Sequence, residues 1–323
     1  MRPLRLGLVG VGIGHSLSPT LHRAGLLALG RGGSYTCFEA PTEVAFLARV
    51  AQLKAGDLDG LNVTTPWKSL AALKCDVVFR CDATGGLHAP SGTTRGPVNT
   101  LFMRDGRLVG TSTDGPGLGL ALAHCGVVLD SGPIAVIGTG GAGASIAHWL
   151  MAMGADLRWL SNRSIASAER LAADLGRRAD GNGVTVGKGV MVGNGVIVAP
   201  WRRPDAMAAA TVVIHASRVG HGKEGEEAAA AARDLQHLPW QAWAKTATLI
   251  DLVYGDGATA AQRCAQAAGM PADRVVQHSG RAMLAGQAAL SLGIWSGAKP
   301  PVAAMLAAAG LGAPVVVPGP SAR

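Results

Sequence analysis

The chain has 323 residues, 48% of them hydrophobic, which excludes a wholly disordered protein and allows two domains with separate cores. Its net charge of +8 comes with only 15% charged residues and no long Lys/Arg run, so nucleic-acid binding is disfavoured, and a small anionic substrate with a phosphorylated cofactor explains the excess. No charge-free run of about 18 apolar residues occurs, which argues against a membrane span. The five scattered cysteines lack metal or CxxC spacing and indicate free thiols in a reducing compartment, the cytoplasm.

The N-terminal part of the chain predicts strands that alternate with helices. Strands are expected at residues 4–11, 34–38, 58–63 and 97–102, and helices at 20–29, 43–53 and around 69–73. Alternation of this kind is typical of the α/β class with a mostly parallel sheet. Ser18, which precedes Pro19, is expected to cap the first helix.

The pattern restarts at Pro133 with a βαβ unit. It consists of the strand PIAVIG, a glycine turn, a helix through Met153 and a strand at 156–160. A helix at 165–178 should follow, and the Gly/Val-rich segment 181–198 is interpreted as one strand with a padded loop. TVVIHAS and TATLIDLVY predict two further strands, residues 281–295 predict a long helix, and the tail from Ala308 is expected to fray.

Gly138, Gly140 and Gly143 form a G-x-G-x-x-G fingerprint directly after a strand and before a helix, which favours dinucleotide binding over a chance glycine turn. Glycine lets the pyrophosphate approach the free N–H groups of the helix N-terminus. The next strand ends in Asn162, Arg163 and Ser164, with no carboxylate to repel a 2′-phosphate. The sequence therefore favours NADP and leaves NAD possible.

Four segments carry candidate substrate groups. In HSLSP, Ser16 and Ser18 are two residues apart and could form a carboxylate site, or Ser18 could be only a helix cap. Lys68 follows a strand and the turn at Pro66, where such sheets place functional residues, although an exposed loop lysine would look similar. Asn99 comes from VNT, and Asp114, from TSTDGPG, could be only a helix cap.

Taken in order, HSLSP, NVTTPWK, VNT, STDGPG, VIGTGGAG, NRS, DLVY and SGRAMLAGQAA resemble the shikimate dehydrogenase family, over about residues 6–297. The resemblance implies an α/β substrate-binding domain at 1–117, completed by C-terminal helices at about 281–308. It also implies a Rossmann-type NADP-binding domain at 118–280 and a disordered tail at 309–323.

The family's activity would be the reversible NADP-dependent reduction of 3-dehydroshikimate to shikimate, in the chorismate pathway to aromatic amino acids. Lys68 and Asp114 would be the catalytic pair, with Lys68 moving the proton and no metal required. The substrate would contact Ser16, Ser18, Thr64, Asn99, Tyr254 and Gln287. The cofactor would contact Gly138, Gly140, Gly141, Ala142, Gly143, Asn162, Arg163, Ser164, Ser217, Leu252 and Gly280. The partners implied are a small ring acid and, at most, a second copy in a homodimer.

Several positions depart from the family pattern and suggest a divergent paralogue. Arg23, Ser112 and His215 each stand where the family usually has Asn, and the usual proline before the histidine-serine motif is absent. Ser112 is expected to weaken the Asp114 loop, and His215 to alter nicotinamide packing. Quinate or a modified ring acid is therefore an alternative substrate, with NAD or NADP as cofactor. A non-catalytic sensor is another alternative, which the retention of Lys68 and Asp114 disfavours.

Overall fold

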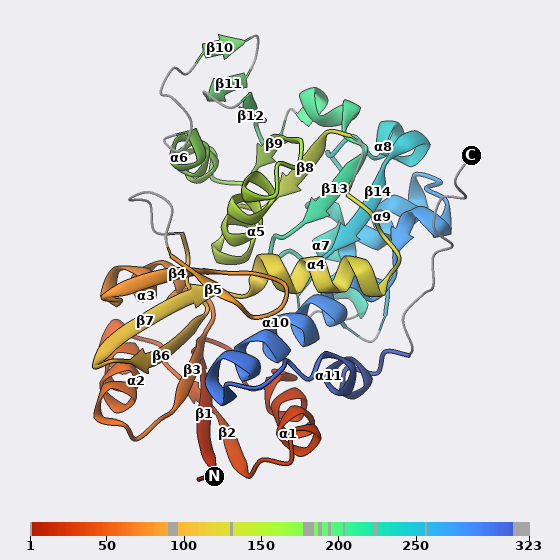
Figure 1. The fold of residues 1–323 in the computed structure, drawn as a ribbon. Helices are drawn as coiled ribbons and strands as arrows, with labels where there is room; N and C mark the ends of the chain where they lie inside the picture. Colours follow the sequence, from red (N-terminus) through yellow and green to blue (C-terminus); the bar gives the residue numbers. More distant parts are fainter. Residues whose placement is uncertain are drawn as a thin grey trace, which may run out of the picture. The chain divides into compact units, whose positions relative to one another are not determined.

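The computed structural model describes residues 2–89, 96–129, 132–176, 184–186, 189–192, 195–202, 204–221, 225–255 and 257–312. By its internal contacts the chain divides into two units, drawn as ribbons in Figure 1. Unit 1 combines Met1–Leu120 with Arg281–Gly312, and unit 2 is built mainly from Ala121–Gly280.

Unit 1 contains a mixed seven-stranded sheet. In sheet order its strands are β2 (Gly33–Glu39), β1 (Leu4–Gly10), β3 (Gly60–Val63), β6 (Thr100–Arg104), β7 (Arg107–Ser112), β4 (Val77–Cys81) and β5 (Leu87–His88). β1 pairs in parallel with β2 and β3, whereas β6 is antiparallel to both β3 and β7. The turn between β6 and β7 has φ of 51° at Asp105 and 71° at Gly106, a tight hairpin that forces antiparallel pairing.

Helices cover this sheet, so the predicted α/β class is confirmed. They are α1 (Ser18–Ala28), α2 (Glu43–Ala55), α3 (Lys68–Lys74), α4 (Asp114–His124), α10 (Ser279–Ser296) and α11 (Val302–Ala308). The Thr42 side chain caps α2 by accepting a hydrogen bond from the Ala45 N–H, and Gly56 ends the helix at φ 81°. α2 buries Phe46 and Leu53 in a core that also contains the strand residue Leu61.

The prediction that Ser18 caps the first helix is wrong. Ser18 is already the first helical residue, Leu17 occupies the N-cap position, and no side chain caps α1 through that position. The helix starts one residue earlier because the Ser16 hydroxyl oxygen accepts the free Ser18 N–H at 3.2 Å. The Ser18 hydroxyl is thereby left for other partners.

Unit 2 contains an eight-stranded sheet. In sheet order its strands are β10 (Val184–Val186), β11 (Gly189–Val192), β12 (Val196–Val198), β9 (Leu157–Ser161), β8 (Ile134–Ile137), β13 (Val212–His215), β14 (Thr248–Asp251) and β15 (Val275–Val276). From β12 to β15 every neighbouring pair is parallel. Counted from β8 in chain order, these six strands run 3-2-1-4-5-6, which is the order of the Rossmann fold and confirms that expectation.

The Gly/Val-rich segment was predicted as one strand with a padded loop, and this is only partly right. Its described residues form three short strands, of which β12 is the third parallel strand of the fold. β10 and β11 extend the sheet beyond β12 as an antiparallel hairpin. Each of the three strands contains two valines, a residue that favours strands.

The helices of unit 2 are α5 (Gly141–Ala152), α6 (Ile165–Gly176), α7 (Gly225–Arg233), α8 (Trp240–Thr246) and α9 (Ala260–Ala267), with 3-10 turns η1 (Pro204–Ala209) and η2 (Ala272–Arg274). The predicted end of the helix at Arg178 lies outside the described residues, as does the tail from 313 onward. Trp243 anchors the core, packing edge-on against Trp240 at 5.3 Å and donating its indole N–H to the Met207 carbonyl.

The sequence also predicted free thiols and argued against a membrane span. All five cysteines are free thiols, as expected. Within the part of the chain that the structure describes, the helices are too short or too polar to cross a bilayer.

Candidate functional site

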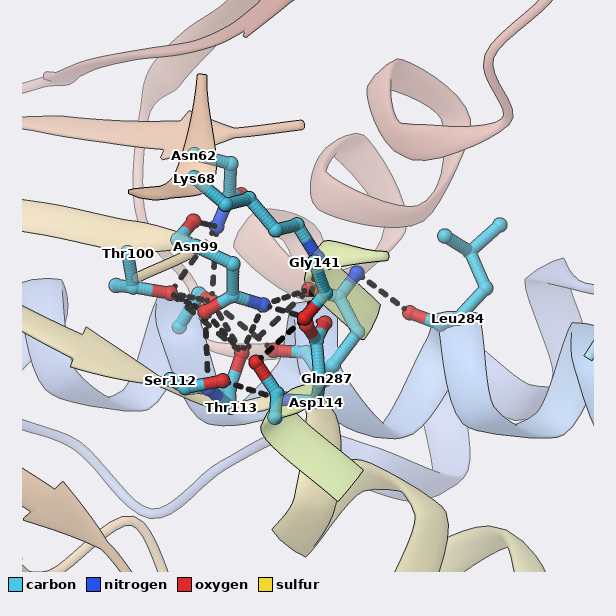
Figure 2. A network of polar contacts seen from close by, with 12 residues as sticks. Asn62, Lys68, Asn99, Thr100, Ser112, Thr113, Asp114, Gly141, Leu284 and Gln287 are labelled. Atoms are coloured by element: carbon cyan, nitrogen blue, oxygen red, sulfur yellow. Dashed lines mark hydrogen bonds and ion pairs between the residues drawn. The ribbon is translucent and has the colours of Figure 1, made fainter. Parts of the chain in front are cut away.

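Lys68 and Asp114 form a buried ion pair in unit 1 (Figure 2). Each is the first residue of its helix, α3 and α4, and their Nζ and Oδ2 atoms lie 2.5 Å apart. Only 9% of Lys68 and 4% of Asp114 is exposed. A buried pair of this kind is costly unless further hydrogen bonds hold it, so the surrounding contacts decide its geometry.

Asn99 is the residue that fixes the Asp114 carboxylate. Its amide nitrogen donates to Asp114 Oδ1 at 2.9 Å and to Gln287 Oε1 at 3.2 Å. Its amide oxygen accepts the main-chain N–H of Thr113 at 2.9 Å and the Thr100 hydroxyl at 2.9 Å. Because a main-chain N–H can only donate, the orientation of the amide is determined and its nitrogen must face Asp114.

Ser112, the departure expected to weaken the Asp114 loop, lies beside this group. Its hydroxyl oxygen accepts the Asp114 main-chain N–H, at 3.4 Å. The serine therefore still supplies a hydrogen-bond acceptor at the start of α4, although a long one.

A second layer of the network was missed in the sequence. The amide nitrogen of Asn62, on β3, donates to the main-chain carbonyl of Asn99 at 3.1 Å and to the Ser291 hydroxyl at 3.0 Å. The amide oxygen of Asn62 accepts a hydrogen bond from the Tyr35 hydroxyl at 2.8 Å. Asn62 could have been found, because an asparagine among the buried residues of a strand must be hydrogen-bonded to be tolerated. Ser291 lies one turn beyond Gln287 on α10, and no local pattern marks it.

The serine pair lies near Tyr35. Ser16 donates to the Ser18 hydroxyl at 3.1 Å, and the Ser18 side chain is close enough to the Tyr35 phenol to affect its pKa. Burial raises the pKa of Tyr35 well above its ordinary value, so the phenol stays protonated and donates to Asn62. Hydrogen bonds thus join Tyr35, Asn62 and Asn99 to the ion pair.

Two further predicted substrate residues, Thr64 and Tyr254, make packing contacts. Thr64 follows β3, and its methyl group packs against Gly10; among the described residues its hydroxyl makes no hydrogen bond to the polar cluster. Tyr254 belongs to unit 2, where its ring meets the edge of His221 at 5.1 Å. For both residues, contact with substrate stays a prediction.

The glycine turn of unit 2 has the shape that a pyrophosphate needs. Gly138 has φ of 101°, and a Cβ there would lie 2.6 Å from the Ser217 main-chain nitrogen. A Cβ on Gly143 would overlap the Gly138 carbonyl oxygen, whereas one on Gly140 would meet nothing within 4 Å. The open space at Gly140 lies at the N-cap of α5, whose first residues, Gly141 and Ala142, contribute N–H groups that favour an anion. These residues therefore fit a dinucleotide.

The segment after β9 is tied to this turn. Asn162 accepts the Thr139 N–H at 3.4 Å and donates to the Ser164 carbonyl at 3.2 Å, which leaves the exposed Arg163 between them. Thr139 lies inside the glycine fingerprint, so the asparagine holds the arginine segment beside the turn. An arginine at this place suits a 2′-phosphate.

His215, the other marked departure, is buried at the end of β13 and has two partners. One ring nitrogen lies 2.8 Å from the Asp251 carboxylate and the other 2.6 Å from the Ser217 hydroxyl. Because an ionised carboxylate only accepts, the ring nitrogen that faces Asp251 carries a proton, and the other nitrogen shares a hydrogen bond with the Ser217 hydroxyl. His215 thus orients Ser217 beside the glycine turn.

Leu252 and Gly280, the last predicted cofactor residues, contact one another. A Cβ on Gly280 would lie 2.7 Å from the Leu252 carbonyl oxygen. Glycine is therefore required at this close approach of two main-chain segments within unit 2.

Comparison with known proteins relates both units to one family. Residues 8–83 match the family model described as the shikimate dehydrogenase substrate binding domain, and residues 280–309 match the shikimate 5′-dehydrogenase C-terminal domain. A shikimate dehydrogenase (NADP(+)) from Halobacterium salinarum is 35% identical over 303 residues, which cover 94% of this chain and 97% of the relative.

Solved structures extend the likeness to the fold. The shikimate 5-dehydrogenase of Thermus thermophilus, in complex with NADP(H) and shikimate, is similar with a TM-score of 0.70 and 30% identity over 95% of this chain and 98% of that one. Quinate dehydrogenase from Corynebacterium glutamicum, in complex with NAD, has a TM-score of 0.70 over 95% of this chain and 98% of that one. Its identity is 23%, so this second likeness speaks for the fold alone.

Proposed function

The chain belongs to the shikimate dehydrogenase family, and on that premise we propose that it catalyses the reversible NADP-dependent reduction of 3-dehydroshikimate to shikimate. The single observation that carries the proposal is the Lys68–Asp114 pair, held at 2.5 Å by a buried network. In this proposal the product serves aromatic amino-acid biosynthesis.

Lys68 is the proton donor and acceptor of the reaction. In the reducing direction its ammonium gives a proton to the ketone oxygen of the ring, and in the oxidising direction the same nitrogen accepts the hydroxyl proton. Asp114 holds Lys68 at one end of its carboxylate and is itself held by Asn99 at the other. This arrangement lets Asp114 orient Lys68 and accept a hydrogen bond from a ring hydroxyl.

The remaining groups recognise the rest of the ring acid. Ser16 and Ser18 supply hydroxyl donors for the carboxylate, and Asn99 and Gln287 supply amide groups for ring hydroxyls. Thr64 and Tyr254 are further contacts in this proposal. A site that hydrogen-bonds each hydroxyl discriminates strongly, because a ligand without one leaves a buried polar group unpaired.

The cofactor is NADP, which exchanges a hydride with the ring carbon when bound. Gly138, Gly140 and Gly143, with Gly141 and Ala142, hold its pyrophosphate at the N-terminus of α5. Asn162, Arg163 and Ser164 hold the phosphorylated ribose, and Ser217, Leu252 and Gly280 lie toward the nicotinamide. Unit 1 is accordingly the substrate-binding domain and unit 2 the cofactor-binding domain.

The proposed reaction also bears on the protein's partners, its compartment and its oligomeric state. A reaction between a small ring acid and a dinucleotide needs no nucleic acid, and we place it in the cytoplasm with the chain as a monomer or homodimer. Light scattering coupled to size-exclusion chromatography measures the oligomeric state; a mass above that of two chains would contradict this part.

The test is an absorbance assay of reduced nicotinamide with four pairs of reactants: shikimate or quinate, each with NADP+ or NAD+. The expected result is fastest turnover, as kcat/KM, with shikimate and NADP+. Preference for quinate would assign the neighbouring activity within the family. Binding of both ligands without turnover in any pair would contradict the proposal and favour a sensor.

A further inference from the structure

A polar cavity of about 280 Å³ lies in unit 2 beside the strands that follow the glycine turn. Among the described residues it is lined by Arg163, Trp201, Arg202, Arg233, Asp234 and His237. β9 and β12 are parallel neighbours, with Val198 opposite Leu160, so the segments that follow them leave the sheet at the same edge. Arg163 comes from the first segment, and Trp201 and Arg202 come from the second.

The described residues that line the cavity carry an excess of positive charge. They supply three guanidinium groups and one carboxylate, and none of the three arginines makes an ion pair with another described residue. Burial, aided by the Arg202 charge, lowers the pKa of His237, so the imidazole is neutral at pH 7. The excess charge therefore lies on the arginines, whose mutual repulsion an anionic ligand would relieve.

An aromatic wall borders these charges. Trp201 is only 9% exposed, and its indole lies 5.1 Å from the His237 ring. His237 also hydrogen-bonds to the Trp201 main chain, while its Nε2 atom is buried without a partner among the described residues. A flat apolar wall beside guanidinium groups and an unsatisfied ring nitrogen suits a heterocycle that carries a phosphate.

The size of the cavity and its link to the glycine turn narrow the ligand further. A volume of about 280 Å³ suits one part of a dinucleotide and not the whole molecule. Thr139, inside the fingerprint, bonds to Asn162, and Arg163 is the next residue and lines the cavity. A dinucleotide with its pyrophosphate on the turn would extend its adenosine toward this place.

We propose that Arg202 and Arg233 join Arg163 in binding the 2′-phosphate of NADP and thereby set the preference for NADP over NAD. The two residues come from the segment after β12 and from the end of α7, outside the βαβ unit where the sequence pattern for cofactor choice is found. The inference rests on the proposed function only in its choice of dinucleotide. The group that the arginines would bind is a phosphomonoester on a ribose.

Binding titrations of the full chain test the proposal without any substrate. The variants are Arg202→Gln, Arg233→Gln and both together, and the ligands are NADP+, NAD+, 2′,5′-ADP and inorganic phosphate. Each single change should raise the Kd for NADP+ and for 2′,5′-ADP about tenfold, because each removes one charge-assisted contact. The Kd for NAD+ should stay within about twofold. Arg170→Gln, which changes an exposed arginine of α6 outside the cavity, is the matched control and should change none of these values.

Several outcomes would overturn the proposal. Equal losses of affinity for NADP+ and NAD+ would show that the arginines contact a part of the dinucleotide that both cofactors share. Unchanged affinities would remove them from the site, and inorganic phosphate binding as tightly as 2′,5′-ADP would indicate a general phosphate site. Circular dichroism of each variant shows that it is folded. Tight NADP+ binding without shikimate turnover would contradict the proposed function and leave this inference standing.

Discussion

His22 is a neutral, buried histidine of unit 1. Its ring is fully buried, stacks on Tyr35 at 3.9 Å, and hydrogen-bonds through Nδ1 to the Ser18 carbonyl. Burial lowers its pKa to about 4, and no described residue partners its Nε2. Protonation would therefore place an unpaired charge beside the serine pair and Tyr35.

This depressed pKa predicts a pH-dependent stability. Between pH 6.5 and pH 4 the unfolded chain binds a proton at His22 that the folded chain does not bind. The His22 contribution to the free energy of unfolding is therefore fully present above pH 6.5 and is lost as the pH falls toward 4. From pH 7 to pH 5 the loss is about 2 kcal/mol. Urea unfolding of wild type and His22→Phe measures it. The variant, which keeps an aromatic ring against Tyr35, should lose less stability over this interval, and an equal loss in both proteins would contradict the account.

In the proposed reaction Asp114 has a role separable from that of Lys68, because it would both hold the lysine and accept a hydrogen bond from the substrate. Asp114→Asn removes the charge but keeps the size and one oxygen. We expect kcat for shikimate oxidation to fall by about 100-fold. Steady-state kinetics measures this value, with Asp105→Asn on the β6–β7 turn as a control that should leave kcat unchanged. A kcat within about twofold of wild type would contradict the assigned role.

At this scale the sequence predicted the central residues of the polar network better than their supports. Lys68, Asn99, Asp114 and Gln287 were all predicted, and hydrogen bonds or an ion pair connect them. Tyr35 and Ser291 were missed because each looks like an ordinary core or helix residue in its own segment. Their partners are remote, and Ser291 meets Asn62 from 229 positions away, so no local pattern carries the information.

At the scale of elements, two glycines of the same turn should respond differently to the same change. A Cβ at Gly143 would overlap the Gly138 carbonyl oxygen, and main chain cannot yield without moving the turn. A Cβ at Gly140 would meet nothing in the protein but would enter the space proposed for the pyrophosphate. Gly143→Ala should therefore destabilise the fold, whereas Gly140→Ala should leave stability unchanged.

Thermal unfolding and NADP+ titration together check this contrast. We expect a Tm lower by several degrees for Gly143→Ala alone, since a cost of about 1 kcal/mol shifts the Tm of a domain this size by about 2–4 °C. Gly140→Ala should keep its Tm and bind NADP+ at least about tenfold more weakly. Full NADP+ affinity in Gly140→Ala would contradict the proposed place of the pyrophosphate.

Elements with a strong hydrophobic periodicity were predicted closely. Strands that depend on pairing with a neighbouring strand were not. β1, α2 and β8 lie within a few residues of their expected bounds. β4 and β7 were missed, although the Asp105–Gly106 dipeptide between β6 and β7 is a local hairpin signal. The hairpin also explains why the unit 1 sheet is mixed, since alternation of helices and strands indicates only the parallel part.

At the scale of the whole molecule, unit 1 is discontinuous in sequence. From Arg281 onward, α10 and α11 follow the stretch Ala121–Gly280 of unit 2 yet belong to unit 1, where Trp295 donates to the Leu101 carbonyl and Gln287 accepts a hydrogen bond from Asn99. Periodicity predicts α10 as a helix but not its destination. Only the resemblance to a family supplied that part of the architecture.

The central claim is that Lys68 moves the proton during turnover and is not required to bind the ring acid. Lys68→Met keeps the length and apolar stem of the side chain and removes its amine. The most direct measurement compares, for wild type and this variant, the shikimate Kd by calorimetry and kcat with NADP+. The account predicts a kcat lower by at least about 100-fold with a Kd changed by less than about tenfold. A variant that turns over within about twofold of the wild-type rate would contradict it.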